Sequence, residues 1–319
     1  MVDPCLICGK RIPFSFSWRE LLTLKPFSRA LLYPVQHWLC LECRKELEWI
    51  EEGCSRCSKP LKTPQHRPAA SAKTSLTEAR LTKARSTFSG EAAISDEATA
   101  IPSGATATFG EARANTGSTI TSSAGTFDGI LCDDCERWLI WEEEQENRPV
   151  LIRNISVLRY NRWAQEVLIR YKFRGDERLK YLLASLLVYS PHQNLLQQLF
   201  LTADLITSIP LSPSRLKERG FNQAERVAEL VAHFFNKPFL PHLLLCQDDE
   251  EKQSKRGRQE RLAKIFDRFL NNPHHLADIK NKRIIVIDDI YTTGATLHAA
   301  AHCLRQGGAW EVTGVTIAR

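Results

Sequence analysis

The segment RIIVIDDIYTTGATL, residues 283–297, constrains the fold of this chain more than any other stretch. It opens with a continuous β-branched run of the kind that forms a strand buried on both faces of a parallel sheet. Two adjacent aspartates follow, then a threonine-rich loop, and then apolar residues at helical spacing. Because ligands of open α/β sheets lie beyond the carboxyl ends of the strands, this order predicts a βα unit with a charged ligand at the junction.

The loop and the aspartates suit different parts of such a ligand. Backbone N–H groups at a helix N-terminus bind phosphate, Gly294 permits close approach, and threonine hydroxyls add donors. Thr296 is also a candidate helix cap. A phosphate would repel Asp288 and Asp289, which instead suit the vicinal hydroxyls of a sugar, alone or bridged by Mg²⁺. A ribose 5-phosphate meets both requirements, whereas an ordinary strand end with a capped helix is the alternative.

The rest of the C-terminal half alternates strand and helix patterns. Strands are expected at 155–160, 203–210, 283–288 and 311–318. Helices are expected at 161–173, 178–189, 221–235 and 295–306, the last ending at Gly307. His298 and His302 are one turn apart on the last helix, whose apolar face accounts for them without a ligand role. The alternation predicts a doubly wound α/β domain over residues 150–319.

Eight of the ten cysteines form four C-x-x-C pairs in the N-terminal half of the chain. The paired residues are Cys5 and Cys8, Cys40 and Cys43, Cys54 and Cys57, and Cys132 and Cys135. Because Zn²⁺ takes four soft ligands in a tetrahedron, the pairs predict a structural zinc module over residues 1–61 and 130–149, with one site or two. The single cysteines, Cys246 and Cys303, are interpreted as buried apolar residues.

The composition changes between the third and fourth cysteine pairs. Residues 62–129 are dominated by alanine, serine, threonine and glycine. Such a sequence does not bury enough apolar surface to offset its ordering entropy, which predicts a disordered insertion within the zinc module.

Basic residues are unevenly distributed. The chain has 43 Lys and Arg against 37 Asp and Glu, and residues 151–182 carry eight basic residues against three acidic ones. Residues 252–268 carry seven basic residues against two acidic ones. Clusters of this kind favour a polyanion, either nucleic acid or phosphates, although a solvated charged surface is the alternative.

The motifs resemble two known groups of proteins. VIDDIYTTGATL (286–297) resembles the 5-phosphoribosyl-1-pyrophosphate (PRPP) signature of type I phosphoribosyltransferases. YKFRGD (171–176), SIPLSPSRLKERGFNQAERVAEL (208–230) and EKQSKRGRQERL (251–262), behind a cysteine module, resemble the ComF family of competence proteins. The resemblance covers the chain except 62–129, and RLKERGFNQA is its most specific block. It implies a PRPP-binding, Rossmann-like parallel sheet of the type I phosphoribosyltransferase fold with a zinc-bearing appendage.

The resemblance also implies roles for individual residues. Asp288 and Asp289 would be the catalytic pair, holding the ribose hydroxyls. The 5-phosphate would be wrapped by Thr292, Thr293, Gly294, Ala295 and Thr296. Arg215 and Arg219, in a loop after the 203–210 strand, would lie nearest the pyrophosphate. Arg219 to Gln223 could equally be only a turn and helix cap, since Asn222 caps well in any fold.

Residues 251–262 fall where such enzymes carry a mobile loop over the site, and their cations suit a pyrophosphate or a nucleic acid strand equally well. The candidate nucleic-acid contacts are Lys172, Arg174, Lys252, Lys255, Arg256, Arg258 and Arg261.

Two functions are compatible with the sequence. In the first, the resemblance implies a role in natural transformation, with single-stranded DNA, a PRPP-type phosphosugar and a helicase-like competence protein as partners. In the second, the protein is an Mg²⁺-dependent phosphoribosyltransferase, but no motif identifies its acceptor or a general base. The first is favoured, because a fold by itself does not establish catalysis.

The sequence also predicts where the protein acts. No segment approaches the roughly 20 apolar residues of a membrane span, and the N-terminus has no signal-peptide pattern. A cytoplasmic protein is therefore expected, with possible association with the inner face of the membrane.

Overall fold

The computed structural model describes residues 4–12, 33–61, 120–122, 125–127, 130–145, 150–248 and 266–319. These residues belong to one compact unit, Met1–Leu61 together with Gly117–Arg319. Within them, no helix has the length and apolar character needed to cross a bilayer.

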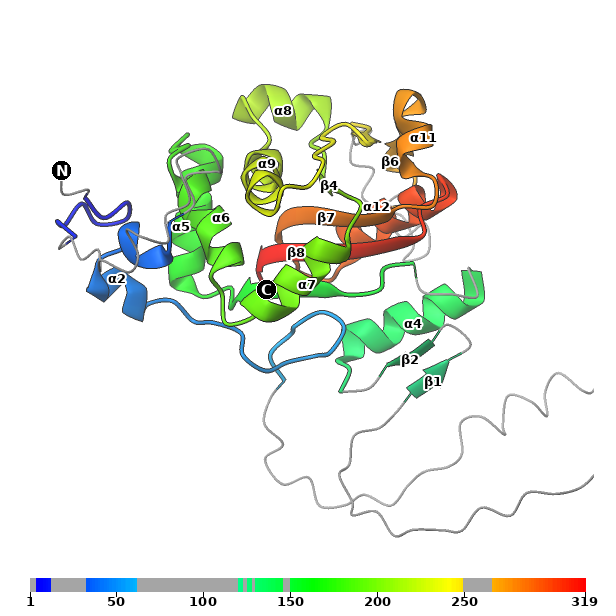
Figure 1. The fold of residues 1–319 in the computed structure, drawn as a ribbon, viewed down its shortest axis with the longest axis horizontal. Helices are drawn as coiled ribbons and strands as arrows, with labels where there is room; N and C mark the ends of the chain where they lie inside the picture. Colours follow the sequence, from blue (N-terminus) through cyan, green and yellow to red (C-terminus); the bar gives the residue numbers. More distant parts are fainter. Residues whose placement is uncertain are drawn as a thin grey trace, which may run out of the picture. The chain divides into compact units, whose positions relative to one another are not determined.

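A four-stranded parallel sheet forms the centre of this unit (Figure 1). Its strands, in the order β3-β8-β7-β4, are Asn154–Leu158, Glu311–Ala318, Arg283–Ile290 and Leu205–Ser208. All three pairings are parallel, with Asp288 opposite Thr316 of β8 and Ser208 opposite Ile287 of β7. The four strands predicted from the sequence are confirmed, and their carboxyl ends lie along one edge.

Helices bury both faces of the sheet, as the apolar run of β7 predicts. Alternate β7 residues join two different cores: Ile285 and Ile287 pack with helices on one face, whereas Ile284 and Val286 pack on the other. The first face is covered by α5 (Arg162–Phe173), α6 (Leu179–Val188), α7 (Gln193–Thr202) and α9 (Gln223–Phe235). The second is covered by α12 (Ala295–Gln306).

Asparagine side chains begin two of these helices. Asn161 Oδ1 accepts a hydrogen bond from Ala164 N–H at the start of α5, and Asn222 Oδ1 accepts one from Ala224 N–H at the start of α9. Asn222 also donates through Nδ2 to the Ile209 carbonyl at 3.0 Å. The cap of α9 is therefore attached to the carboxyl end of β4.

Smaller elements complete the α/β part. They are α8 (Pro213–Arg219), the antiparallel strands β5 (Leu244–Cys246) and β6 (Phe269–Asn271), the 3₁₀ helix η2 (Pro273–His275) and α11 (Leu276–Ile279). The sequence did not predict α7, and the single cysteines Cys246 and Cys303 are buried as expected.

The cysteine-rich part has little regular structure apart from one long helix. Its elements are η1 (Val35–His37), α2 (Leu41–Lys45) and α4 (Asp133–Gln145). An antiparallel pair, β1 (Ile120–Ser122) and β2 (Gly125–Phe127), falls inside the predicted insertion 62–129. The remainder of that range lies outside the described residues, so its disorder and the domain boundaries stay predictions.

Candidate functional site

A cavity of about 190 Å³ lies at the carboxyl ends of β4 and β7, the edge at which the sequence predicts a ligand. We call it the phosphosugar cavity, after the ligand that the sequence predicts for this edge of the sheet. Its polar and charged lining residues are Lys172, Arg215, Arg219, Asn222, Gln223, Arg268, Asp288, Asp289 and Thr296. The fold thus brings together the predicted aspartates and both predicted pyrophosphate cations, which lie some seventy residues apart in the chain.

The two aspartates at the end of β7 have different surroundings. Asp288 Oδ1 accepts a hydrogen bond from the Asp289 backbone N–H at 2.8 Å, whereas the Asp289 carboxylate forms an ion pair with Lys172 of α5. Burial and the neighbouring charge of Asp289 raise the pKa of Asp288 to about 7. A cation or a hydroxyl donor from a ligand would therefore stabilise the charged form of Asp288.

The predicted pyrophosphate cations lie on a helix, not in a loop. Arg215 and Arg219 belong to α8, so the prediction of a loop after β4 is wrong over these residues. The helix escaped detection because none of its residues is buried, which leaves no apolar stripe in the sequence. Arg219 Nη1 donates to Gln223 Oε1 at 3.2 Å, and its guanidinium lies 5.4 Å from the centre of the Phe173 ring.

The loop after β7 ends at Gly294, where the chain turns and α12 begins. This residue has φ 87°, in the left-handed region that side chains disfavour. A Cβ there would lie 2.2 Å from the hydroxyl oxygen of Tyr291, which is itself buried. Gly294 is the N-cap and the helix begins at Ala295, so the prediction that Thr296 caps the helix is wrong. Thr296 instead lines the phosphosugar cavity.

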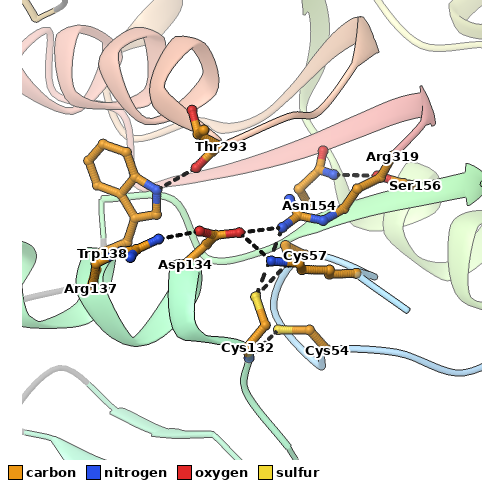
Figure 2. Close-up of polar contacts among 11 residues, drawn as sticks. Cys54, Cys57, Cys132, Asp134, Arg137, Trp138, Asn154, Ser156, Thr293 and Arg319 are labelled. Carbon is orange, nitrogen blue, oxygen red and sulfur yellow. Dashed lines mark hydrogen bonds and ion pairs between the residues drawn. The ribbon is translucent and has the colours of Figure 1, made fainter. Parts of the chain in front are cut away.

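The other threonines of this loop are exposed. The Thr293 carbonyl accepts a hydrogen bond from Trp138 Nε1 at 2.7 Å (Figure 2). The first backbone hydrogen bond of α12 runs from His298 N–H to the Gly294 carbonyl at 2.9 Å. The N–H groups of residues 295–297 therefore have no partner within the helix, which is the usual arrangement of a phosphate-binding N-terminus.

A second cavity, of about 500 Å³, lies at the carboxyl ends of β3 and β8. Ile290 lines this cavity and the phosphosugar cavity, so the two are neighbours along the sheet edge. The lining residues that can carry charge or donate hydrogen bonds are Glu48, Lys59, Asp134, Arg159, Tyr160, Asn161, Tyr291, Thr292 and Arg319.

The predicted nucleic-acid contacts fall into three groups. Lys172 is only 15% exposed and lies in the phosphosugar cavity, paired with Asp289. Arg174 is exposed at the end of α5. The others, Lys252, Lys255, Arg256, Arg258 and Arg261, lie outside the described residues. Their contact with nucleic acid stays a prediction.

The eight paired cysteines form two tetrads. Cys5, Cys8, Cys40 and Cys43 make the first tetrad, and Cys54, Cys57, Cys132 and Cys135 make the second tetrad. Within each, the four sulfur atoms lie within 4.8 Å of one another. The structure thus answers the question that the spacing left open: the pairs assemble into two sites, and the fourth pair joins the third.

The sulfur geometry fits a tetrahedral metal ion. A tetrahedron with metal–sulfur bonds of about 2.3 Å places its sulfur atoms about 3.8 Å apart. The Cys8 and Cys40 sulfur atoms are 3.6 Å apart, and those of Cys57 and Cys132 are 3.5 Å apart. All ten cysteines are described, and all are free thiols. Both tetrads could therefore hold a metal ion.

The second tetrad is surrounded by groups that suit negatively charged sulfur. The Cys132 backbone N–H donates to Cys54 Sγ at 3.3 Å, and Arg319 Nη2 lies 3.9 Å from Cys132 Sγ. Arg319 Nη2 also donates to Asp134, which accepts from Lys59 as well (Figure 2 shows Asp134 between Arg137 and Arg319). Four thiolates around one divalent ion leave a net negative charge, which the Cys132 N–H and Arg319 would partly balance.

Sequence reasoning missed a buried group beside this tetrad. Glu142 is fully buried, pairs with Arg56, and lies 3.3 Å from His298 Nδ1. His298 was interpreted as a residue explained by its helix face, yet it joins this polar group. The only sequence signals are the position of Arg56 between Cys54 and Cys57 and that of Glu142 two turns after Cys135.

Comparison with known proteins agrees with the fold. Residues 226–319 match the phosphoribosyl transferase domain family. Competence protein ComFC of Bacillus subtilis is 38% identical over 192 residues, which cover 59% of this chain and 72% of that protein. Competence protein ComFC of Streptococcus pneumoniae is 30% identical over 193 residues, which cover 59% and 74% of the two chains.

A more distant relative carries a different name. The DNA utilization protein YhgH of Escherichia coli K12 is 29% identical over 114 residues, which cover 34% of this chain and 46% of that protein. The extent of the Bacillus and Streptococcus matches, together with the phosphoribosyl transferase domain, shows that this chain belongs to the ComF family.

Proposed function

We propose that this protein acts in DNA uptake during natural transformation, binding single-stranded DNA and a PRPP-type phosphosugar. The names of its relatives, competence protein and DNA utilization protein, support the role in DNA uptake. The main support for the proposed ligand is the phosphosugar cavity. Two carboxylates and the cations of α8 line it, and α12 begins nearby after a turn at Gly294.

The cavity suits each part of PRPP. Asp288 and Asp289 hold the ribose hydroxyls, and the loop with the first turn of α12 receives the 5-phosphate. Arg215 and Arg219 are the cations for the pyrophosphate. Mg²⁺, when bound with PRPP, would offset the charge of the pyrophosphate and of the aspartates. Lys172 already offsets Asp289, so the ligand mainly changes the environment of Asp288.

Single-stranded DNA would contact basic residues at the sheet edge and beyond it. Arg159 and Arg174 are exposed, and Arg159 lies in the second cavity beside the half-exposed ring of Tyr160. Cations that follow a phosphate backbone, with an aromatic ring for base stacking, are the usual elements of single-strand binding. Binding to DNA should therefore weaken strongly as salt rises. A helicase-like competence protein is the proposed protein partner, at the inner face of the membrane.

Structural Zn²⁺ is the proposed occupant of both tetrads, with one ion in each. All-cysteine ligand sets with closed tetrahedral geometry are typical of structural zinc. The reducing cytoplasm in which we propose that the protein acts keeps such thiols available for metal.

A phosphoribosyltransferase activity is the second candidate, and one observation favours it. The second cavity shares Ile290 with the phosphosugar cavity, so an acceptor there would lie beside the ribose. PRPP would lose pyrophosphate from C1 while cations stabilise the leaving group. Release of pyrophosphate from PRPP, with nucleotides or single-stranded DNA as acceptors, tests this candidate directly.

The proposed role is tested by transformation of cells that lack the protein. The wild-type chain should restore DNA uptake, and the double variant D288A/D289A should not. Calorimetry on the purified double variant should show that PRPP binding is lost. Unchanged PRPP affinity in that variant would remove the phosphosugar cavity as the ligand site, and full uptake would separate the cavity from the biological role.

A further inference from the structure

The second tetrad is connected to the phosphate-binding loop through one helix. Helix α4 begins at Asp133, between the ligands Cys132 and Cys135, so the tetrad fixes its first turn. Trp138 and Glu142 follow on successive turns of α4, and both are buried. Figure 2 shows Trp138 extending from α4 toward Thr293, with Cys54, Cys57 and Cys132 of the second tetrad on the other side of Asp134.

Trp138 orients a peptide group of the loop. Its Nε1–H donates to the Thr293 carbonyl at 2.7 Å, and its ring stacks on His298 with 4.1 Å between ring centres and 9° between the planes. The Thr293 carbonyl and the Gly294 N–H belong to one trans peptide plane and point in opposite directions. Because Trp138 holds the carbonyl toward α4, the Gly294 N–H points away from α4.

A buried polar chain connects the same tetrad to the first turn of α12. Arg56, between Cys54 and Cys57, donates to Glu142 and to the Leu151 carbonyl at 2.7 Å. Glu142 Oε1 lies 3.3 Å from His298 Nδ1 and also accepts from the Val150 N–H at 3.2 Å. His298 supplies the first backbone hydrogen bond of α12. Arg56, Glu142 and His298 are each at most 1% exposed, so displacing any of them would remove a polar contact from the protein interior.

We propose that metal binding at the second tetrad orders the phosphate-binding loop, and that Trp138 is the positioning residue that transmits this order. The inference deepens the proposed function, since it concerns the same phosphosugar cavity. Both C-x-x-C pairs of the second tetrad contribute: one carries Arg56, and the other begins the helix that carries Trp138 and Glu142.

The first tetrad provides an internal control, because its neighbours lie elsewhere. Arg170 of α5 donates to the Ile7 and Leu6 carbonyls between Cys5 and Cys8. Trp38, two residues before Cys40, donates through Nε1 to Ser185 Oγ of α6 at 2.9 Å. These contacts join the first tetrad to helices on the other face of the sheet from α12.

The test uses backbone amide hydrogen exchange of the 292–298 segment in the full-length, metal-loaded protein without PRPP. Trp138→Phe keeps an aromatic ring against His298 but removes the N–H donor, so it should retain both metal ions and exchange faster in this segment. Cys135→Ser should lose one metal ion, and its 292–298 segment should also exchange faster than in the wild type. Trp141→Phe changes a ring that contacts both Trp138 and Phe266 but keeps the Trp138 N–H donor, so it should leave the segment unchanged. Cys8→Ser in the first tetrad should also leave it unchanged.

PRPP affinity is the second readout. Loss of one hydrogen bond of ordinary strength predicts PRPP binding about fivefold weaker in Trp138→Phe and unchanged in Trp141→Phe. Equal loop exchange in wild type and Trp138→Phe would overturn the inference, even if Cys135→Ser proves too unstable to purify. Failure of the wild-type protein to bind PRPP would instead reject the proposed ligand, while the exchange measurement still decides whether the tetrad orders the loop.

Discussion

The two cysteine tetrads have the same ligands and different surroundings. The first tetrad includes the exposed Cys8, and α2, which follows Cys40 and contains Cys43, carries an exposed Lys45–Glu42 ion pair. The second tetrad is buried at all four cysteines and encloses Arg56, whose charge is balanced by the buried Glu142. Equal sets of cysteines therefore need not imply an equal role. Residues beside the first tetrad contact α5 and α6, whereas the second tetrad lies at the start of α4, whose Trp138 donates to the Thr293 carbonyl.

The largest expected difference between the tetrads concerns loss of a metal ligand. Cys135→Ser should reduce zinc from two equivalents to one and lower the melting temperature by about 10 °C or more, because metal binding supplies folding free energy directly. Cys8→Ser should also lose one equivalent but lower the melting temperature less, since Cys8 is exposed. Elemental analysis and thermal unfolding measure both quantities. Equal temperature shifts would show that the tetrads contribute alike.

A smaller difference is expected at the two carboxylates beside the tetrads. Glu142→Gln removes the carboxylate that balances the buried Arg56 charge, which should lower the free energy of unfolding by about 3 kcal/mol. Glu42→Gln, beside the first tetrad, removes an exposed ion pair and should change the free energy of unfolding by less than about 0.5 kcal/mol. Urea denaturation of the two variants provides the measurement. A near-neutral Glu142→Gln would mean that solvent reaches Arg56.

The same contrast explains how much of the molecule the sequence could predict. Periodic and contiguous patterns were sufficient for all four sheet strands and for α5, α6, α9 and α12, because one buried face imposes a regular spacing. The aspartates and the glycine turn were predicted because they lie together in one short motif, and the two cations belong to a second short motif about seventy residues earlier. Helix α8 was missed because it buries none of its residues.

What the sequence could not supply is contact between distant segments. Cys54 and Cys132 are separated by the 62–129 range, and spacing alone does not say which C-x-x-C pairs meet. Likewise the basic neighbours of Lys172 in the sequence predict a nucleic-acid contact, yet the fold places this lysine against Asp289. Trp138, Glu142 and His298 come from two helices more than 150 residues apart, and each has an ordinary apolar or solvated interpretation on its own helix.

The smallest expected effect is on the pH dependence of stability. It distinguishes the two tetrads because, among the described residues, only the second tetrad is adjacent to His298. Burial lowers the pKa of His298 to about 4, although Glu142 opposes this shift. The unfolded chain therefore takes up a proton near pH 6.5 that the folded chain takes up only near pH 4, so stability falls as the pH drops through this window.

Between pH 6.5 and 5, the free energy of unfolding should decrease by about 1–2 kcal/mol less in His298→Gln than in the wild type. This difference in slope is expected whatever the effect of the substitution on stability at neutral pH. Urea denaturation at several pH values, with zinc content measured in parallel, separates this proton uptake from protonation of the cysteines. If His298→Gln keeps the full wild-type slope, then His298 is protonated in the folded state, and its contact with Glu142 is an ion pair that strengthens on acidification. In that case the loop beside the second tetrad should become more ordered at low pH, and amide exchange of residues 292–298 would slow beyond the intrinsic pH effect.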